Sequence, residues 1–149
     1  MHHLEQLQPE IWNALCEASE VQLRAASIVA CKCALSKTGV DDACVVDAMK
    51  TILGGSRLTG EQRGRLKCLL AELDDRYLSH QEEVDENQQD NEEWITLFAQ
   101  ARAVTTIFSA TDQDAFKSAV ESIYEAAATS DSNEELISLI HDHFADLLA

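Results

Sequence analysis

Two close pairs of potential metal ligands occur in the sequence, Cys31-x-Cys33 and His141-x-His143. Each pair lies in a stretch whose apolar spacing predicts a helix, where residues two positions apart point to nearly opposite sides. Two such ligands cannot bind one ion unless the helix unwinds. The sequence contains no Glu-x-x-His pair of the kind that holds bridged metals in helix bundles, and no G-x-S-x-G nucleophile elbow. We therefore predict no metal site, no cofactor and no catalytic residue.

The segment GGSRLTGEQ resembles a phosphate-binding loop, because Gly55 and Gly60 have the G-x-x-x-x-G spacing. In such a loop the next two residues are Lys and Ser or Thr, and a strand precedes the first glycine. Here those two positions hold Glu61 and Gln62, and no strand is predicted before them. Because a carboxylate at that point would repel phosphate, we interpret the segment as a turn between two helices.

The most acidic stretch of the chain is EEVDENQQDNEEW, residues 82–94, which has seven carboxylates and no basic residue. A calcium loop of the EF-hand type beginning at Asp85 needs Gly where Asp90 stands and a bidentate Glu where Thr96 stands. The stretch is therefore not a calcium loop of that kind, and its carboxylates need another explanation.

Local structure explains only part of this acidity. Asp90, Glu92 and Glu93 precede or begin a predicted helix, where carboxylates satisfy free N–H groups and the helix dipole. The other four crowd the end of the preceding helix, where each is unfavourable by roughly 0.3–1 kcal/mol. They form either a solvated helix face that keeps the protein soluble or an anionic surface that binds a partner. The candidate partner-binding residues on that helix are Glu72, Asp75, Glu82, Glu83, Asp85 and Glu86.

The net charge of −16 is distributed unevenly along the chain. Residues 1–70 hold eight acidic and eight basic residues, whereas residues 71–149 hold nineteen acidic residues against three basic ones. Such a field repels nucleic acid and anionic membranes and speeds the encounter with a basic partner. We therefore expect a basic protein partner, and neither nucleic acid nor a membrane.

Five cysteines, an odd number without a repeated spacing, do not indicate a disulfide framework. We expect all five to be reduced and mostly buried, in a cytoplasmic protein. The first ten residues do not resemble a signal peptide. The longest mostly apolar stretch, residues 25–35, contains Lys32 and is too short to span a membrane.

The elements that carry these residues are predicted to be helices, because Ala, Leu, Glu and Gln dominate and no stretch alternates with a period of two. We predict an all-α fold, an antiparallel bundle of six or seven helices in a single domain over residues 1–149. Helices are expected to begin at Pro9, at Ser19 with Gln22, at Asp41 or Asp42, at Thr59 with Gln62, at Asp90 or Asn91, at Thr111 or Asp112, and within residues 131–133. The expected ends are Gly39, Gly54–Gly55 and, for the longest helix, a residue near Glu86.

Apolar spacing predicts which helices lie inside the bundle. Residues 21–37 are apolar nearly all round, as is typical of a central helix. The long helix has a single apolar stripe, made of Leu66, Leu70, Leu73, Tyr77 and Val84. The next helix has the clearest amphipathic face, made of Trp94, Leu97, Phe98, Ala101, Val104, Thr105 and Phe108. Arg102 flanks that face and would be costly there unless paired, so we predict a bidentate contact with Glu121 or Glu125.

In its small size, acidity, helicity and lack of catalytic motifs, the chain resembles bacterial immunity proteins, which neutralise toxins by direct binding. The resemblance implies a toxin partner, often a nuclease whose cationic cleft would match the acidic helix face. Two other classes remain open. Secretion chaperones are also small and acidic, but the known ones mix strands with helices. An enzyme or a ligand-binding bundle would instead carry a bound metal or cofactor.

Overall fold

The computed structural model describes residues 9–87, 92–129, 134, 136–140 and 142, and of residues 80–87 and 92–94 it describes the backbone alone. Within these ranges the chain is helical, with short connections and no strand, which confirms the predicted all-α class. The helices are α2 (Pro9–Glu17), α3 (Glu20–Thr38), α4 (Ala43–Leu53), α5 (Gly60–Asn87), α6 (Glu92–Ala110) and α7 (Ala115–Ala127). Residues 136–140 are helical as well.

Two helices begin with the reciprocal caps that the sequence predicts. At the start of α3, the Ser19 hydroxyl accepts from the Gln22 N–H at 3.2 Å, and the Gln22 side chain accepts from the Ser19 N–H at 2.9 Å. Thr59 and Gln62 repeat this arrangement at the start of α5, at 3.1 and 2.9 Å. Each pair satisfies two N–H groups that a helix start otherwise leaves without partners.

The predicted helix ends are confirmed too. α3 ends at Gly39, whose φ of 68° is the left-handed conformation that glycine adopts without strain. α4 ends at Gly54, so GGSRLTGEQ contains a connection between two helices and not a phosphate loop. The backbone of α5 continues through Glu86 to Asn87.

α7 begins later than predicted, because Asp114 and neither Thr111 nor Asp112 caps it. The Asp114 carboxylate accepts from the Lys117 N–H at 3.0 Å. Thr111 instead donates its hydroxyl to the Phe108 carbonyl at 2.8 Å, and the Asp112 carboxylate accepts from the Asp114 N–H at 2.9 Å. Both side chains are thus engaged in the turn after α6, and the next acceptor in the chain becomes the cap.

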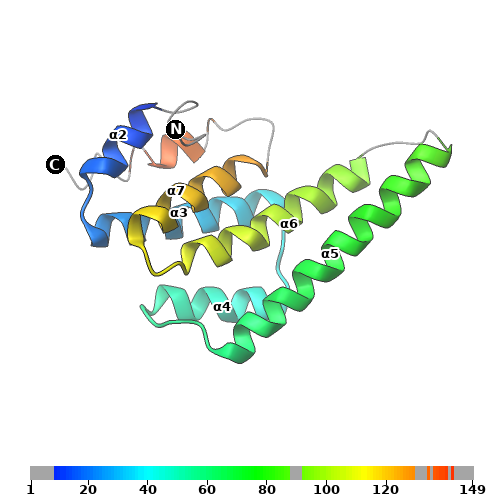
Figure 1. Ribbon diagram of the computed structural model, residues 1–149, viewed down its shortest axis with the longest axis horizontal. Helices are drawn as coiled ribbons and strands as arrows, with labels where there is room; N and C mark the ends of the chain where they lie inside the picture. The colour runs from blue at the N-terminus through cyan, green and yellow to red at the C-terminus, as the bar shows by residue number, and fades with distance from the viewer. Residues whose placement is uncertain (1–8, 88–91, 130–133, 135, 141, 143–149) are drawn as a thin grey trace.

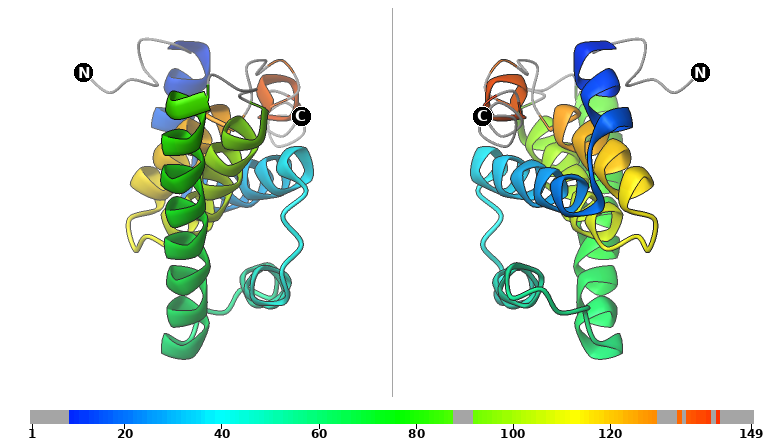
Figure 2. Two further views of the ribbon diagram at one scale, coloured as in Figure 1. Left: turned by 90° about the vertical axis from the view of Figure 1, so that its right-hand side faces the viewer. Right: turned by 90° about the vertical axis from the view of Figure 1, so that its left-hand side faces the viewer.

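α3, α6 and α7 pack against one another in all three pairs. Figure 1 shows these helices side by side, with α5 running obliquely past α6 until its C-terminal end extends beyond the other helices. α4 packs on α5 and α2 packs on α7. Figure 2 shows α4 nearly end-on beside the first half of α5, so these two helices cross.

Small side chains allow the close approach of α3, α6 and α7. The buried residues at their contacts include Ala26, Ser27, Ala30, Cys31, Ala34, Ala103, Thr106, Ala110, Ser118, Ala119, Ser122 and Ala126. The hydroxyls of Ser27 and Ser118 lie 3.0 Å apart, and Ser118 also donates to the Ala110 carbonyl at 3.0 Å. These contacts satisfy two buried polar groups where an unpaired hydroxyl would be unfavourable.

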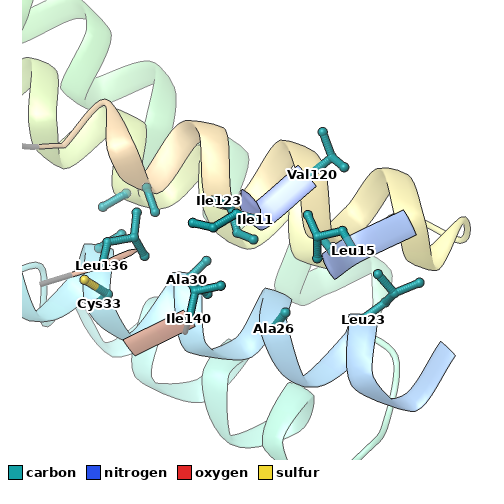
Figure 3. Close-up of a cluster of buried hydrophobic side chains, with 14 residues drawn as sticks. Ile11, Leu15, Leu23, Ala26, Ala30, Cys33, Val120, Ile123, Leu136 and Ile140 are labelled. Atoms are coloured by element: carbon teal, nitrogen blue, oxygen red, sulfur yellow. The ribbon is translucent and has the colours of Figure 1, made fainter. Parts of the chain in front are cut away.

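Larger side chains fill two core clusters that share α3. Figure 3 shows the first, in which residues of α2, α7 and the segment 136–140 meet over α3; its labelled members are Ile11, Leu15, Leu23, Ala26, Ala30, Cys33, Val120, Ile123, Leu136 and Ile140. The second lies among α4, α5 and α6 and includes Val45, Met49, Leu66, Leu73, Val104 and Ile107. Cys33 belongs to the first cluster and Cys31 to the second. This division confirms that the two thiols face opposite sides of α3 and that α3 is a central helix.

α6 is not the one-faced amphipathic helix that the sequence predicts. Leu97, Ala101 and Val104 of the predicted face are buried. Residues off that face are buried as well, namely Ala103, Thr106, Ile107 and Ala110. The reason is that α6 lies between α5 and the α3–α7 pair, so that more than one of its sides is covered. Phe98 of the predicted face is correspondingly displaced from the core and is 41% exposed.

All five cysteines are free, but the prediction that most of them are buried is wrong. Cys31 and Cys33 are buried, Cys44 is half-buried, and Cys16 and Cys68 are exposed. The exposed pair, Cys16 of α2 and Cys68 of α5, belongs to neither core cluster. Burial raises the pKa of the Cys31 thiol to about 12, so this thiol is inert near neutral pH.

Candidate functional site

The predicted acidic site lies on α5. Glu72 and Asp75 are both exposed on that helix. The Glu72 carboxylate is 2.6 Å from the Arg76 guanidinium one turn later, so its charge is partly compensated. The other predicted side chains lie outside the described residues, although the α5 backbone runs through them: Glu82, Glu83, Asp85 and Glu86. A binding role for these six carboxylates stays a prediction.

Exposed apolar side chains lie close to the same acidic helix. Leu78 of α5 is 55% exposed, and Ile95 and Phe98 of α6 are 52% and 41% exposed. The Tyr77 and Phe98 rings, with centroids 5.8 Å apart, join the two helices at this point. We call Tyr77, Leu78, Ile95 and Phe98, together with Asp74 and Asp75, the α5–α6 patch.

Helical spacing makes the patch residues of each helix neighbours, and the Tyr77–Phe98 ring contact joins the two groups. On α5, Asp74, Tyr77 and Leu78 are three and four residues apart, so their side chains are neighbours. On α6, Ile95 and Phe98 are three residues apart and are neighbours for the same reason. The patch therefore has an apolar centre on two packed helices. Its edge carries the exposed carboxylates of Asp74 and Asp75, which have no cationic partner among the described side chains.

A half-buried ion pair fixes one edge of the patch. Arg102 Nη1 lies 3.3 Å from Glu125 Oε2, and the guanidinium carbon of Arg102 is 5.6 Å from the centroid of the Phe98 ring. The predicted pairing of Arg102 is thus confirmed with Glu125, through one contact and not the bidentate geometry expected. Phe98 is held between this cation and Tyr77, so its ring is positioned before any partner arrives.

Burial affects both members of this ion pair, through the pKa of Glu125 and through the hydrogen bonding of Arg102. Desolvation raises the pKa of Glu125 above its usual value, although the neighbouring Arg102 acts in the opposite direction. Arg102 Nε is buried and has no hydrogen-bond partner within the described part of the chain. The pair is therefore only partly satisfied, and its main structural effect is to hold Arg102 over Phe98.

Sequence reasoning placed Phe98 in the core and did not single out Leu78 or Ile95. In each helix, however, the spacing of the apolar residues indicated which of them would be exposed. Adjacent residues on a helix point about 100° apart, so Phe98 cannot share the centre of a face with its neighbour Leu97. Leu78 is out of phase with the apolar stripe for the same reason, because it directly follows Tyr77. An apolar residue out of phase with its stripe is a candidate for the surface.

Comparisons of the chain with models of protein families, with curated proteins and with solved structures give no match. Within the described ranges, no three His, Cys, Asp or Glu side chains gather in a way that would hold a metal ion. Nor is any helix in the described part of the chain both long enough and apolar enough to cross a membrane.

Proposed function

We propose that the chain is a non-catalytic binding protein that neutralises a basic protein by direct contact through the α5–α6 patch. The observation that supports this function is the exposed apolar centre of the patch, placed beside two carboxylates that have no cationic partner among the described side chains, in the acidic half of the chain. Aromatic and aliphatic anchors surrounded by a charged edge are typical of the energetically dominant part of a protein interface.

The two parts of the patch have different roles in this proposal. The carboxylates steer a cationic partner toward α5 and raise the association rate, an effect that salt screens. Leu78, Ile95 and Phe98 then lose their contact with water and slow dissociation. The backbone of the C-terminal end of α5 extends beyond the other helices, which leaves this end open to a concave partner (Figure 1).

The partner class follows from the resemblance to immunity proteins. A toxin with nuclease activity needs a cationic cleft to bind its nucleic acid, and an acidic convex helix occupying that cleft would exclude the substrate. We propose that the toxin is encoded beside this chain and that neutralisation takes place in the cytoplasm. The described residues contain no strand, which favours this function over that of a secretion chaperone of mixed structure.

Co-expression with the basic domain encoded by the neighbouring gene tests the proposal. The chain should restore growth, and the purified pair should bind with an on-rate that falls about tenfold or more as salt rises from low to high concentration. Asp74→Asn with Asp75→Asn should lower the on-rate at low salt and leave it unchanged at high salt. Glu17→Gln with Asp41→Asn, at two exposed carboxylates outside the patch, is the control with the same change in charge.

Two results would overturn the proposal. One is full binding and full growth rescue by a chain carrying both patch substitutions at low salt. The other is an equal loss in the control variant, because the effect would then come from net charge and not from the patch.

A further inference from the structure

A cleft of about 490 Å³ lies where three segments distant in sequence meet. These are the start of α3, the connection between α4 and α5, and the turn between α6 and α7. In Figure 1 they lie at the opposite end of the molecule from the projecting end of α5. Three of the eight arginine and lysine residues in the first half of the chain line this cleft, namely Arg24, Arg57 and Arg63.

Two of the three guanidinium groups are held in place by other contacts. Arg24 donates to the Asp112 carbonyl at 2.5 Å and to the Gln113 carbonyl at 2.7 Å. Arg63 donates to the Thr111 hydroxyl at 3.3 Å, and its guanidinium carbon lies 5.9 Å from the centroid of the Phe108 ring. Both cations are therefore positioned by neutral groups, so that their positive charge is not cancelled by the contacts that orient them.

The charge balance of the cleft favours an anion. Its lining includes two carboxylates, Glu20 and Asp112. Asp112 is already engaged, because it accepts from the Asp114 N–H at 2.9 Å and lies 3.5 Å from the Lys117 ammonium. These contacts lower the pKa of Asp112, the Asp114 hydrogen bond most strongly, and the nearby charge of Arg24 contributes in the same direction. Asp112 therefore offsets part of the charge of Arg24, whereas no ion pair joins it to Arg57 or Arg63. Arg57 is exposed and has no acidic partner in the described part of the chain.

Apolar side chains complete the walls of the cleft. Ile28, Ile52 and Leu58 line it together with the arginines. Val21, which is 77% exposed, shares a helical stripe with Arg24 and Ile28, at spacings of three and seven residues. A cleft with apolar walls and a few oriented polar groups is the usual form of a small-molecule site, and this volume is within the usual range.

We propose that this cleft binds a small organic anion, a carboxylate or a phosphate ester with an apolar body. Arg57 and Arg63 would pair with the anionic group, Arg24 would hold the α6–α7 turn that forms one wall, and the apolar walls would cover the body. A compact ligand is favoured over a polyanion because the chain carries a net charge of −16, which opposes the approach of many negative charges. This site is separate from the α5–α6 patch and does not depend on the function proposed for that patch.

An NMR titration of the full chain with three probes of similar apolar size tests the proposal. 4-Phenylbutyrate supplies a carboxylate, 4-phenylbutyl phosphate supplies a phosphate ester, and 4-phenylbutylamine is the cationic control. At least one of the anions should shift the amide signals of Gly55, Ser56 and Gln113 saturably, with a Kd below about 1 mM. The relative affinities of the two anions then identify the preferred anionic group.

Substitutions separate a local site from the general field of the protein. Arg57→Gln and Arg63→Gln should each weaken anion binding about tenfold, as expected for one lost charged hydrogen bond. Arg57 is exposed in a connection, so its substitution leaves the fold intact. Arg65→Gln is the matched control, because Arg65 is two residues from Arg63 on the same helix, does not line the cleft and pairs with Glu61 at 2.5 Å. It should change the Kd less than about twofold.

Three results would overturn the proposal. The first is the lack of a saturable shift at these amides with either anion up to about 10 mM, well above the expected Kd. The second is an equal response to 4-phenylbutylamine, which would show that the apolar walls act without the arginines. The third is an equal weakening by Arg65→Gln, which would assign the effect to overall charge.

Discussion

The cleft and the α5–α6 patch differ in sign, in shape and in how their charges are held. In the cleft, Arg24 and Arg63 are oriented by carbonyl, hydroxyl and ring contacts around a hollow. On the patch, Asp74 and Asp75 are exposed without cationic partners in the described residues, on an open helix surface. Oriented charges in a hollow suit a ligand that must be surrounded, whereas exposed charges on an open helix surface suit a partner that supplies its own counter-charges.

The comparison shows that net charge alone is a poor guide to function within a single chain. The net charge of −16 comes from residues 71–149, whereas residues 1–70 are balanced and three of their four arginines line the cleft. Substitutions at the patch should therefore act on protein binding, whereas substitutions at the cleft should act on anion binding or on stability.

The largest expected effect comes from the apolar centre of the patch. Leu78→Ala with Phe98→Ala should weaken binding of the basic partner about 100-fold or more, because two anchors of an interface are removed. Surface plasmon resonance measures this change, mainly as faster dissociation. The matched control is Val46→Ala with Leu53→Ala on α4, whose side chains are 44% and 51% exposed. Comparable weakening in the control would mean that the patch is not the interface.

An intermediate effect should separate two arginines of the cleft. Arg24→Leu leaves the Asp112 and Gln113 carbonyls without their donor and should lower the free energy of unfolding by about 1–3 kcal/mol. Arg57→Leu removes an exposed side chain and should change that free energy by less than about 0.5 kcal/mol. Urea denaturation followed by circular dichroism measures both values. Equal losses would show that Arg24 does not hold the α6–α7 turn.

The smallest expected effect is on the pH dependence of stability. Glu125, at the edge of the patch, and Asp112, in the lining of the cleft, should change it in opposite directions. The raised pKa of Glu125 means that its contribution to stability is present below the ordinary value of 4.5 and is lost as the pH rises. The lowered pKa of Asp112 means that its contribution is present above 3.8 and is lost as the pH falls.

Glu125→Gln and Asp112→Asn test these two directions. Between pH 4 and pH 7, the wild type should lose stability relative to Glu125→Gln, by less than about 1 kcal/mol because the carboxylate is only half-buried. Between pH 5 and pH 3, it should lose stability relative to Asp112→Asn. Thermal melts at a series of pH values give both differences. A common direction for the two variants would contradict the assigned pKa shifts.

The starts and ends of the helices were more predictable from the sequence than the packing of the helices against one another. The caps at Ser19 and Thr59 and the end at Gly39 were predictable because each depends on residues within one helical turn. The pairing of Arg102 was predictable because a desolvated cation without a partner is unfavourable, so that a cation beside an apolar face needs one. The exposure of Phe98 was not predictable from the sequence, because it depends on which helices cover α6. No pattern within one helix determines which other helices pack against it.

The cleft was also beyond sequence reasoning, for a related reason. Arg24, Arg57 and Arg63 are spread over forty residues, and two of them are oriented by groups of the α6–α7 turn, much later in the chain. Their convergence depends on how α3, α5 and α6 pack. A sequence pattern reports the face of one helix, whereas this site is formed where three segments meet.

The small-residue contact between α3 and α7 has a consequence for how the chain folds. Ser27 and Ser118, whose hydroxyls meet there, are 91 residues apart in sequence. Bringing such distant segments together has a large entropic cost, and proteins rich in distant contacts fold slowly. During synthesis α3 leaves the ribosome long before α7 exists, so its Ala and Ser face has no native partner during that time. We therefore expect α6 and α7, which are joined by a short turn, to pair first, and the docking of α3 against them to be the slow step of folding.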